Sequence, residues 1–379
     1  DDFRLRLASY MMPDGGLELL IPDDEGGWGT WDTIPVEDVL TTEIVGLDKT
    51  GSIVLMKDSR GRNTSAVEAC KLEDKQTTLL AENSLADAGD IVRHPTKKHV
   101  QAVSFVYERK LWQIIDRSVE PDMAYLQTVA DGDLEIVSRT LDDRFWVVLY
   151  LVDDGPSRFY LYDRKRQAAS FLFTNRKDLE GQPLVKMHSA VIESRDGLDL
   201  LIYYSLPLDS DTQGDGIPDR PIPMVLFPHG GPWARDFWGY NPWHQWLANR
   251  GYAVMFVNFR SSTGLGKAFT NAGDLEWGDK VIEDQVDAVQ WAIAKGIADP
   301  QRVAVMGGSF GGYSTLAGVT LFPELFACGV DLVGPSSLIT FLESLPPYWQ
   351  PMLELFATRV GDHRTEEGRA LLTKHSPLT

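Results

Sequence analysis

The segment Arg302-Val-Ala-Val-Met-Gly-Gly-Ser-Phe-Gly-Gly-Tyr313 carries the strongest structural signal in this chain of 379 residues. Its apolar, partly β-branched beginning predicts a buried strand, and the stretch 313–321 that follows is compatible with a helix. Between them stands Gly-x-Ser-x-Gly, and strand, sharp turn and helix in this order indicate a nucleophile elbow. We expect Ser309 to lie in that turn with its hydroxyl exposed.

Glycines surround this serine at three positions, Gly307, Gly308 and Gly311. A strained turn needs small neighbours, because only these let adjacent backbones approach closely. The amide that follows the serine, that of Phe310, would then face the oxygen on which negative charge develops during acyl transfer. An ordinary glycine-rich turn is the alternative interpretation, and the flanking strand and helix favour the elbow.

A second glycine pair ends the apolar run Met224-Val-Leu-Phe-Pro-His-Gly-Gly-Pro232. Loops of this kind supply the other backbone donor of the oxyanion hole in esterases and lipases. We therefore expect the amide of Gly231, with Gly230 as the fallback, to act together with that of Phe310. His229 is expected to shape the loop rather than to act as a base, and a plain turn is the alternative.

Arg260 lies in the segment Asn258-Phe-Arg-Ser-Ser-Thr-Gly-Leu-Gly266, directly after another apolar run. Its fork of N–H donors suits a substrate carbonyl or carboxylate. An arginine at the end of a strand also commonly holds neighbouring loops, and this loop-positioning role is the favoured one.

The alternation of strand-like and helix-length segments over 184–379 predicts an α/β-hydrolase domain with a doubly wound, mostly parallel sheet. In the segment 279–295, apolar residues recur at helical spacing and Gly296 follows as a stop signal, which predicts a crossover helix. Strands are expected at 198–205, 224–227, 253–257, 303–306 and 328–332.

Residues 1–183 show short apolar runs with period-two alternation, separated by turns rich in Asp, Gly, Asn and Lys. This pattern is typical of strands, and a cadence of about four strands per 40 to 50 residues suggests β-propeller blades. A β-sandwich is the alternative. Because too few strands are visible for a closed ring, we expect a partial β-propeller domain. Strands are expected at 52–57, 65–72, 100–107, 110–115, 145–152, 158–163 and 168–173.

The chain contains 36 Lys and Arg against 55 Asp and Glu, which gives a formal net charge of −19. Such a surface would repel a phosphate backbone, so nucleic acid is not an expected partner. No apolar run is long enough to cross a bilayer, and we expect a soluble protein without membrane contact. The sequence does not indicate whether its compartment is the cytoplasm or the periplasm. Cys70 and Cys328 lie far apart and are expected to be buried free thiols.

The segment Asp209-Ser-Asp-Thr-Gln-Gly-Asp-Gly-Ile-Pro-Asp219 resembles an acidic calcium loop. Gln213 interrupts the early ligand positions and no Glu closes the loop, so the pattern departs from that of an EF-hand. A solvated acidic hairpin is the favoured interpretation, and no metal or organic cofactor is expected.

Taken as a set, these motifs resemble those of the prolyl oligopeptidase family of serine peptidases, and within it the acylaminoacyl-peptidase and dipeptidyl-aminopeptidase branch. The resemblance is carried by His229-Gly-Gly-Pro232, Asn258-Phe-Arg-Ser-Ser-Thr-Gly264, the segment from Trp277-Gly-Asp279 through Asp284, Gly307-Gly-Ser-Phe-Gly-Gly-Tyr313 and Ser376-Pro377. It implies an α/β-hydrolase peptidase capped by a β-propeller that limits access to short peptides. It also implies Ser309 as the nucleophile, with oxyanion stabilisation from the amides named above.

The catalytic acid and base are the point at which the sequence departs from that pattern. Hydrolases of this fold place Asp or Glu and then His after the serine, and Asp331, Asp362, His363 and His375 are poorly placed to serve. The family pattern would put both residues after Thr379. We therefore expect a fragment that lacks both ends, with the triad Asp and His outside this sequence.

The sequence thus predicts a serine-type peptidase that hydrolyses short peptides through an acyl-enzyme on Ser309. A carboxylesterase of the same fold is one alternative. A catalytically inactive binding protein is another, because a serine without its base is only weakly nucleophilic. The oligomeric state and the residue preference at the cleaved bond are not indicated.

Overall fold

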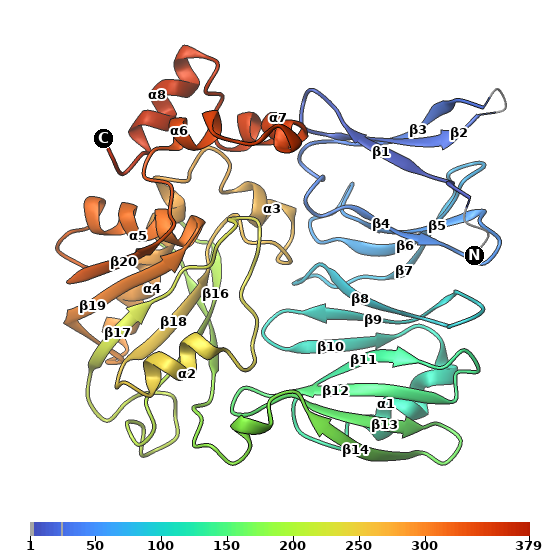
Figure 1. The fold of residues 1–379 in the computed structure, drawn as a ribbon, viewed down its shortest axis with the longest axis horizontal. Helices are drawn as coiled ribbons and strands as arrows, with labels where there is room; N and C mark the ends of the chain where they lie inside the picture. The colour runs from blue at the N-terminus through green and yellow to red at the C-terminus, as the bar shows by residue number, and fades with distance from the viewer. Residues whose placement is uncertain (1–3, 24–25) are drawn as a thin grey trace.

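The computed structural model describes residues 4–23 and 26–379, which form five sheets with helices beside them. Four small antiparallel sheets follow one another along the chain and lie in a stack, and a six-stranded sheet with its helices stands beside that stack (Figure 1). The chain therefore has a propeller-like, sheet-rich part and an α/β-hydrolase part, in the order that the sequence predicts.

The sheet-rich part is built from consecutive antiparallel strands. Its first sheet comprises β1 (Ala8–Met11), β2 (Leu17–Pro22) and β3 (Trp28–Ile34), and its second β4 (Glu43–Leu47), β5 (Ile53–Asp58), β6 (Ala66–Lys71) and β7 (Thr77–Ala81). The third comprises β8 (Ala88–Arg93), β9 (Val100–Val106) and β10 (Lys110–Ile114), and the fourth β11 (Asp133–Arg139), β12 (Phe145–Leu151), β13 (Arg158–Asp163) and β14 (Ala168–Thr174). Shorter elements are η1 (Arg117–Val119), α1 (Glu120–Leu126) and η2 (Lys177–Leu179). Each predicted strand of this part is present, whereas β1 to β4, β7, β8, β11 and α1 were not predicted.

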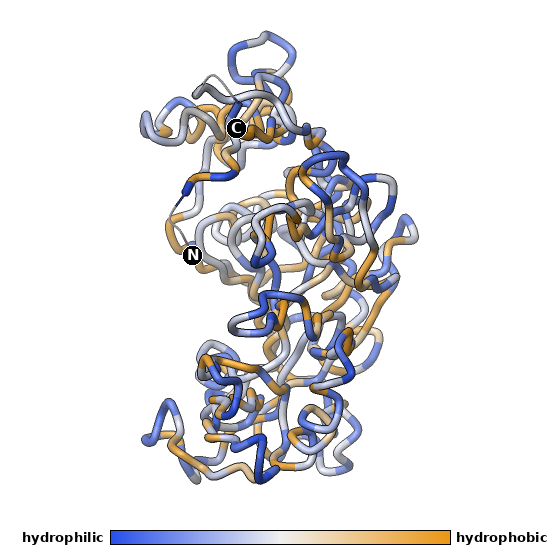
Figure 2. The backbone as a smooth tube through the Cα atoms, turned by 90° about the vertical axis from the view of Figure 1, so that its right-hand side faces the viewer, coloured by the Kyte–Doolittle hydropathy of each residue, from blue (hydrophilic) through white to orange (hydrophobic). Residues whose placement is uncertain are grey.

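Alternation along the strands explains why this part folds as separate layers. In β12, Trp146, Val148 and Tyr150 are buried and their neighbours are less so, which gives one apolar face. That face packs with Tyr162 of β13 and Met123 of α1 in a cluster of its own. Figure 2 shows hydrophobic stretches through the middle of the molecule and many hydrophilic stretches in loops at its periphery.

The six-stranded sheet has the order β15-β16-β18-β17-β19-β20, and its last four strands run parallel. Its strands are β15 (His188–Glu193), β16 (Asp199–Ser205), β17 (Ile222–Leu226), β18 (Ala253–Asn258), β19 (Ala298–Gly308) and β20 (Cys328–Leu332). Its helices are α2 (Pro242–Ala248), α3 (Lys267–Asn271), α4 (Lys280–Ala294), α5 (Phe310–Leu321), α6 (Leu338–Glu343), η3 (Pro347–Trp349), α7 (Gln350–Arg359) and α8 (Glu366–Lys374). The mostly parallel sheet matches the prediction, and β15 is an addition to it.

Two expectations about loops and thiols need correction. The acidic loop 209–219 joins β16 to β17, but β18 lies between these strands, so the loop is a crossover and not a hairpin. Cys70 is buried as expected, whereas Cys328 is exposed. Cys328 begins β20, which forms an edge of the sheet and has four of its five residues exposed.

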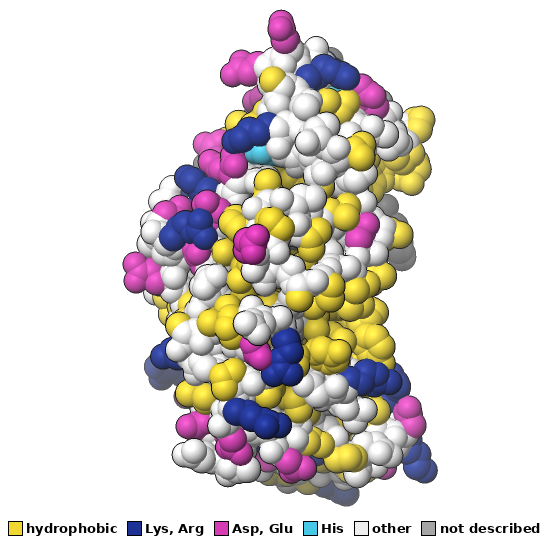
Figure 3. Space-filling model, turned by 90° about the vertical axis from the view of Figure 1, so that its left-hand side faces the viewer, with side chains coloured by type: hydrophobic (Ala, Val, Ile, Leu, Met, Phe, Trp, Pro, Cys, Tyr) yellow, Lys and Arg dark blue, Asp and Glu magenta, His cyan; other side chains and the backbone are white. Residues whose placement is uncertain are grey.

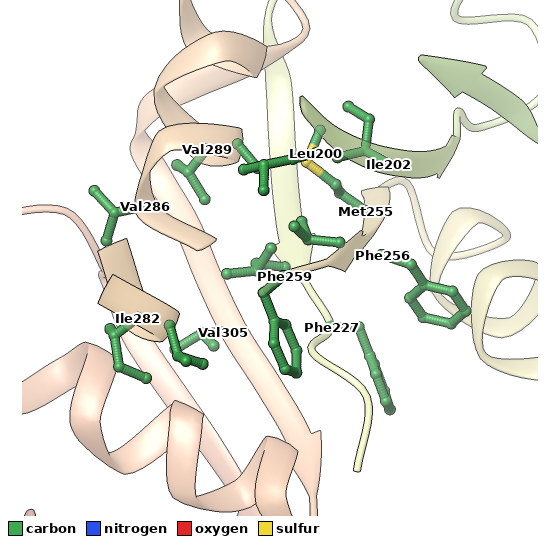
Figure 4. Packing of buried hydrophobic residues seen from close by; sticks show 14 of the residues in the cluster. Leu200, Ile202, Phe227, Met255, Phe256, Phe259, Ile282, Val286, Val289 and Val305 are labelled. Atoms are coloured by element: carbon green, nitrogen blue, oxygen red, sulfur yellow. The ribbon is translucent and has the colours of Figure 1, made fainter. Parts of the chain in front are cut away.

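The main core lies between the sheet and α4 (Figure 4). Ile282, Val286 and Val289 of α4 are buried there with Leu200 of β16 and Val305 of β19. The predicted crossover helix thus packs its apolar face against the sheet. This packing holds the parallel strands, and with them their carboxyl ends, in place. Those strand ends position the site described below.

Polar contacts join the α/β part to the small sheets. Lys267 Nζ of α3 lies 2.6 Å from an Asp38 carboxylate oxygen, and the Ala268 amide donates a 2.9 Å bond to Asn63 Oδ1. A second contact is made by α7, which reaches the first sheet (Figure 1). There Arg359 Nη2 donates a 2.5 Å hydrogen bond to the carbonyl of Val36. The loop after β18 is therefore anchored from outside the hydrolase sheet.

The outer surface of the α/β part is mixed in character. Figure 3 shows acidic, basic and apolar side chains interspersed on this face, without an extended band of one charge. Among the helices of the described residues, none has the length and apolarity that crossing a bilayer requires.

Candidate active site

Ser309 stands between β19 and α5 in a strained conformation. Its backbone has φ 56° and ψ −119°, and it caps the N-terminus of the helix. A positive φ is rare for a residue with a Cβ atom and marks a position whose geometry the surrounding structure imposes. The Ser309 amide donates a 2.9 Å bond to the carbonyl of Leu332, at the end of β20. The predicted strand, turn and helix are thus present, with β19 held between β17 and β20.

The glycines around Ser309 differ in how strongly the turn needs them. A Cβ atom on Gly307 would collide with the backbone of Gly311, and one on Gly311 would collide with the carbonyl oxygen of Pro228. At Gly308 the nearest atom would be 3.8 Å away, which is ordinary van der Waals contact. Close backbone approach therefore requires glycine at 307 and 311, and the same demand does not exist at 308.

A cavity of about 500 Å³ opens beside Ser309. Its lining residues are Gly231, Trp277, Ser309, Phe310, Val333, Gly334, Pro335, Ser336, Ser337, Thr340, Phe341, Ser344 and Leu378. The wall that faces Ser309 comes from the loop after β20 and from α6, which sequence reasoning did not identify. Among the described residues, those that line this cavity are apolar or carry hydroxyl groups, and none is ionisable.

The two expected oxyanion donors lie at this same cavity. Gly231 and Phe310 both line it together with Ser309. Within the described part of the chain, neither amide donates a hydrogen bond to a protein acceptor. Gly230, the alternative donor, is absent from the cavity lining. A Cβ atom on it would lie 3.5 Å from Ser309 Cβ. The geometry favours Gly231 over Gly230 as the donor.

His229 is held within the loop after β17. Its Nδ1 lies 2.7 Å from the carbonyl oxygen of Gly230 and its Nε2 lies 2.9 Å from Ser262 Oγ. Its ring stacks on Phe259 with centroids 4.3 Å apart. Burial lowers the pKa of His229 to about 4, so the ring is neutral at neutral pH. Both ring nitrogens are engaged, which fits a residue that shapes the loop.

Arg260 points away from the cavity and into a buried ion-pair cluster. It is 3% exposed, and its guanidinium binds Asp284 at 2.7 Å and Asp196 at 2.7 Å. Its amide also donates to Asp284. These contacts tie the end of β18 to α4 and to the turn between β15 and β16. The arrangement is that of a residue that holds loops together, and Arg260 is absent from the cavity lining.

An aromatic cluster that sequence reasoning missed supports the cavity wall. Trp277 packs edge-on against Phe310 at 4.7 Å and against Trp233 at 6.3 Å between ring centroids. Trp233 in turn contacts Phe356 of α7, and Phe356 contacts Phe341 of α6. Rings from five different segments thus fix the elbow helix against the opposite wall.

Three of the four residues considered as acid and base, Asp331, Asp362 and His375, are engaged elsewhere. Asp331 accepts a 2.7 Å bond from the Gly334 amide, Asp362 pairs with Arg364 at 2.8 Å, and His375 Nε2 lies 3.1 Å from Asp279. Over residues 4–23 and 26–379, no side chain forms a hydrogen bond with the Ser309 hydroxyl. The described part of the chain also contains no cluster of three or more His, Cys, Asp or Glu suited to a metal ion.

The acidic loop 209–219 uses its carboxylates internally. Asp211 accepts hydrogen bonds from the amides of Gly214 and Gly216 at 2.7 and 2.8 Å, and Asp219 accepts from the hydroxyl of Thr212 at 2.8 Å. These bonds shape the crossover between β16 and β17.

Comparisons with known proteins relate the whole chain to one group of peptidases. Residues 238–356 match the sequence model of the prolyl oligopeptidase family. The chain is 47% identical over 378 residues to dipeptidyl aminopeptidase BIII of Pseudoxanthomonas mexicana, an alignment that covers 100% of this chain and 55% of the relative. It is 37% identical over 403 residues to dipeptidyl peptidase family member 6 of Caenorhabditis elegans, which covers 100% of this chain and 54% of that protein.

A solved peptidase structure shares the fold of this chain. A puromycin-hydrolysing peptidase of Mycobacterium tuberculosis superposes with a TM-score of 0.73 at 19% identity, over 97% of this chain and 55% of that one. The chain spans about half the length of the curated relatives that it matches. The match to the family model over residues 238–356 and the two relatives together make this chain similar to members of the prolyl oligopeptidase family of serine peptidases.

Proposed function

We propose that this chain carries the nucleophile and the oxyanion hole of a peptidase that hydrolyses short peptides. The observation that carries the proposal is the strained backbone of Ser309, between a central strand and a helix, at a cavity that it shares with Gly231 and Phe310. A serine held in this way has its hydroxyl beside free backbone donors, which acyl transfer requires in addition to a base.

In the proposed reaction, the Ser309 oxygen attacks the carbonyl carbon of the scissile peptide bond. The amides of Phe310 and Gly231 stabilise the negative charge on the carbonyl oxygen, and the N-terminus of α5 adds the favourable field of its dipole. Collapse of the tetrahedral intermediate expels the amine and leaves an acyl-enzyme, which water hydrolyses. The part of the substrate on the acyl side lies in the cavity against the wall of α6.

The base that accepts the serine proton and the acid that orients it belong to the proposal as well. No described histidine approaches the Ser309 hydroxyl, and the relatives extend over nearly twice the span of this chain. We assign the triad Asp and His to parts of the protein outside this sequence. The small sheets, proposed as blades of a β-propeller, would restrict access to short peptides.

Covalent labelling tests the nucleophile directly. A fluorophosphonate probe should label the complete gene product at Ser309, and Ser309→Ala should abolish labelling without loss of the folded state. This sequence expressed alone should label far more slowly, because its serine lacks the base. Absence of labelling in the complete protein would instead favour a binding protein that has kept the fold.

Turnover then separates a peptidase from a carboxylesterase. The two use the same serine chemistry, but an amide is the less reactive bond. The complete protein should cleave a dipeptide 4-nitroanilide as well as a 4-nitrophenyl ester. Strong ester turnover with no detectable amide cleavage would contradict the peptidase proposal.

A further inference from the structure

The backbone of His375 and its side chain contact two walls of the cavity beside Ser309. Its carbonyl accepts a 2.8 Å hydrogen bond from the hydroxyl of Tyr313, one helical turn beyond Ser309 in α5. Its Nε2 lies 3.1 Å from Asp279 Oδ2, and Asp279 is two residues from Trp277, which lines the cavity. A Cβ atom on Gly278 would lie 2.8 Å from the Cβ of His375, so the side chain packs directly on that backbone.

The residues that follow His375 contact the opposite wall. Ser376 Oγ accepts a 2.9 Å bond from the amide of Leu338, at the start of α6. The Leu378 amide donates a 3.0 Å bond to the carbonyl of Ser336, and both residues line the cavity. The segment 375–378 therefore joins the elbow helix, the Trp277 loop and the loop before α6, which together enclose the cavity.

The His375 side chain is buried and its hydrogen bonding is one-sided. It is 1% exposed, and within the described residues its Nδ1 has no hydrogen-bond partner. Burial lowers its pKa below the usual range, although the neighbouring Asp279 carboxylate opposes this shift. At neutral pH the ring is thus neutral and donates its Nε2 proton to Asp279.

Few other charged or titratable groups face this pair. Lys374 Nζ lies 2.5 Å from the same Asp279 oxygen, but from the solvent side, with 62% of its side chain exposed. Glu276 acts on His375 only through its more distant charge, and Tyr313 bonds to the backbone carbonyl and not to the ring. Asp279 is therefore the one hydrogen-bonded partner of the ring among the described residues.

We infer that His375 is a positioning residue for substrate: with Asp279 it holds the cavity walls at the spacing that receives the side chain on the acyl side of the scissile bond. The inference rests on the proposed function of Ser309. It assigns to His375 no proton transfer with the substrate. Its loss should weaken the binding of substrates whose acyl-side residue fills the cavity, and should spare those whose residue does not reach the walls.

Two substrates and four variants of the complete gene product test this role. For Ala-Phe-4-nitroanilide, His375→Ala and Asp279→Ala should each raise KM by about tenfold, because small displacements of a binding wall are costly. For Ala-Gly-4-nitroanilide the KM should change by less than about twofold, since glycine does not contact the wall. Lys374→Gln, which removes only the exposed ion pair with the same carboxylate, is the matched control and should leave both KM values within about twofold.

The conservative variant His375→Gln separates positioning from titration. Its amide can donate to Asp279 as Nε2 does, so the KM for the Phe substrate should return close to that of the unchanged protein. In the unchanged protein this KM should rise as the pH falls through the lowered pKa of His375, because a second ring proton at Nδ1 would have no acceptor. With Gln the KM should be nearly independent of pH over that range.

The outcomes distinguish this inference from the proposed function. Equal rises in KM for the Phe and Gly substrates, or an effect of Lys374→Gln as large as that of His375→Ala, would overturn the inference while labelling of Ser309 persists. If the His375 variants do not fold, Asp279→Ala decides alone, since that side chain is 44% exposed and its removal is tolerable. Absence of fluorophosphonate labelling in the unchanged protein would overturn the proposed function, and the inference with it.

Discussion

The hydroxyl of Ser262 lies 2.9 Å from Nε2 of His229, and this contact ties the loop after β18 to the loop after β17. The carbonyl of Gly230 can only accept, so His229 donates to it from Nδ1 and must accept from Ser262 at Nε2. Ser262 is fully buried, and the loop that carries it is anchored on the small sheets. The backbone of Gly230 and Gly231 is therefore held by His229, by Ser262 behind it, and by the small sheets that anchor the Ser262 loop.

Ser262→Ala should accordingly impair catalysis more than binding. The substitution leaves Nε2 of His229 buried without a donor and loosens the Gly231 amide, the proposed donor to the transition state. We expect kcat on a peptide substrate to fall by about tenfold with little change in KM. Steady-state kinetics measure this split, and a rise in KM at constant kcat would contradict the assignment of Gly231.

Replacing Ser261 by glycine should stabilise the fold. Its φ is 85°, it is fully buried, and among the described residues its hydroxyl has no hydrogen-bond partner. Ser261→Gly removes both penalties and should raise the free energy of unfolding by about 1 kcal/mol. Urea denaturation followed by fluorescence measures the change. Ser262→Gly, one residue along, loses the bond to His229 and should destabilise; stabilisation by both would show that strain is not the cause.

Alanine substitutions at Gly311 and Gly308 test the steric argument for the nucleophile elbow. A methyl group on Gly311 would strike the carbonyl of Pro228, whereas one on Gly308 meets nothing closer than 3.8 Å. Gly311→Ala should therefore lower the free energy of unfolding by about 3 kcal/mol or more and abolish labelling of Ser309, because the backbone must shift. Gly308→Ala should cost less than about 1 kcal/mol. Thermal unfolding of the two variants decides, and equal losses would refute the steric argument.

The uncharged cavity lining predicts which substrates are accepted. Arg, Lys, Asp or Glu on the acyl side would find no counter-ion among the described lining residues, and burying such an unpaired charge costs several kcal/mol. Substrates with Phe or Met in that position should have kcat/KM at least about a hundredfold above that of the Arg analogue. Thr340→Asp places a carboxylate on the wall and should raise the Arg-to-Phe ratio by about tenfold or more, while Thr340→Asn should not. An unchanged ratio in the Asp variant would place the acyl-side residue elsewhere.

Buried neutral histidines should make the fold sensitive to acid. His244 is fully buried with Nδ1 at 2.9 Å from Ser205 Oγ, and burial lowers its pKa from 6.5 to about 3. Below pH 6.5 His244 is protonated in the unfolded chain but stays neutral in the folded chain. The free energy of unfolding therefore decreases as the pH falls toward 3, by about 1.4 kcal/mol per pH unit. Urea titrations at several pH values measure the slope. His244→Gln should make it shallower, and an unchanged slope would exclude His244 as a contributor.

The elbow could be predicted because its signals are local. The run before Ser309 is apolar, the glycines are adjacent, and the helix follows directly, so β19 and α5 needed no knowledge of distant residues. The crossover helix α4 was equally clear, since its apolar stripe lies within one segment. Short strands of mixed composition such as β1 and β15 were not predicted, because their pairing and not their composition makes them strands.

The cavity wall could not be predicted, because the fold assembles it from separate parts of the chain. Thr340 and Phe341 reach Ser309 only once β20 has paired with β19 and the chain has turned back into α6. The partner of Arg260 at Asp196 lies 64 positions earlier, with nothing in the local sequence to announce it. Exposure of Cys328 likewise depends on β20 forming an edge, which is a property of the sheet and not of the strand.

The placement of Ser309 at the end of β19, flanked by β17 and β20, has a consequence for how such a protein can diversify. The proposed reactive oxygen lies at the end of a central strand, whereas the cavity wall proposed to select substrates comes from α6 and nearby loops. Heritable changes in those loops can redirect the choice of peptide without disturbing the chemistry. Proteins that share this reaction centre can in this way differ in the peptides that they cleave.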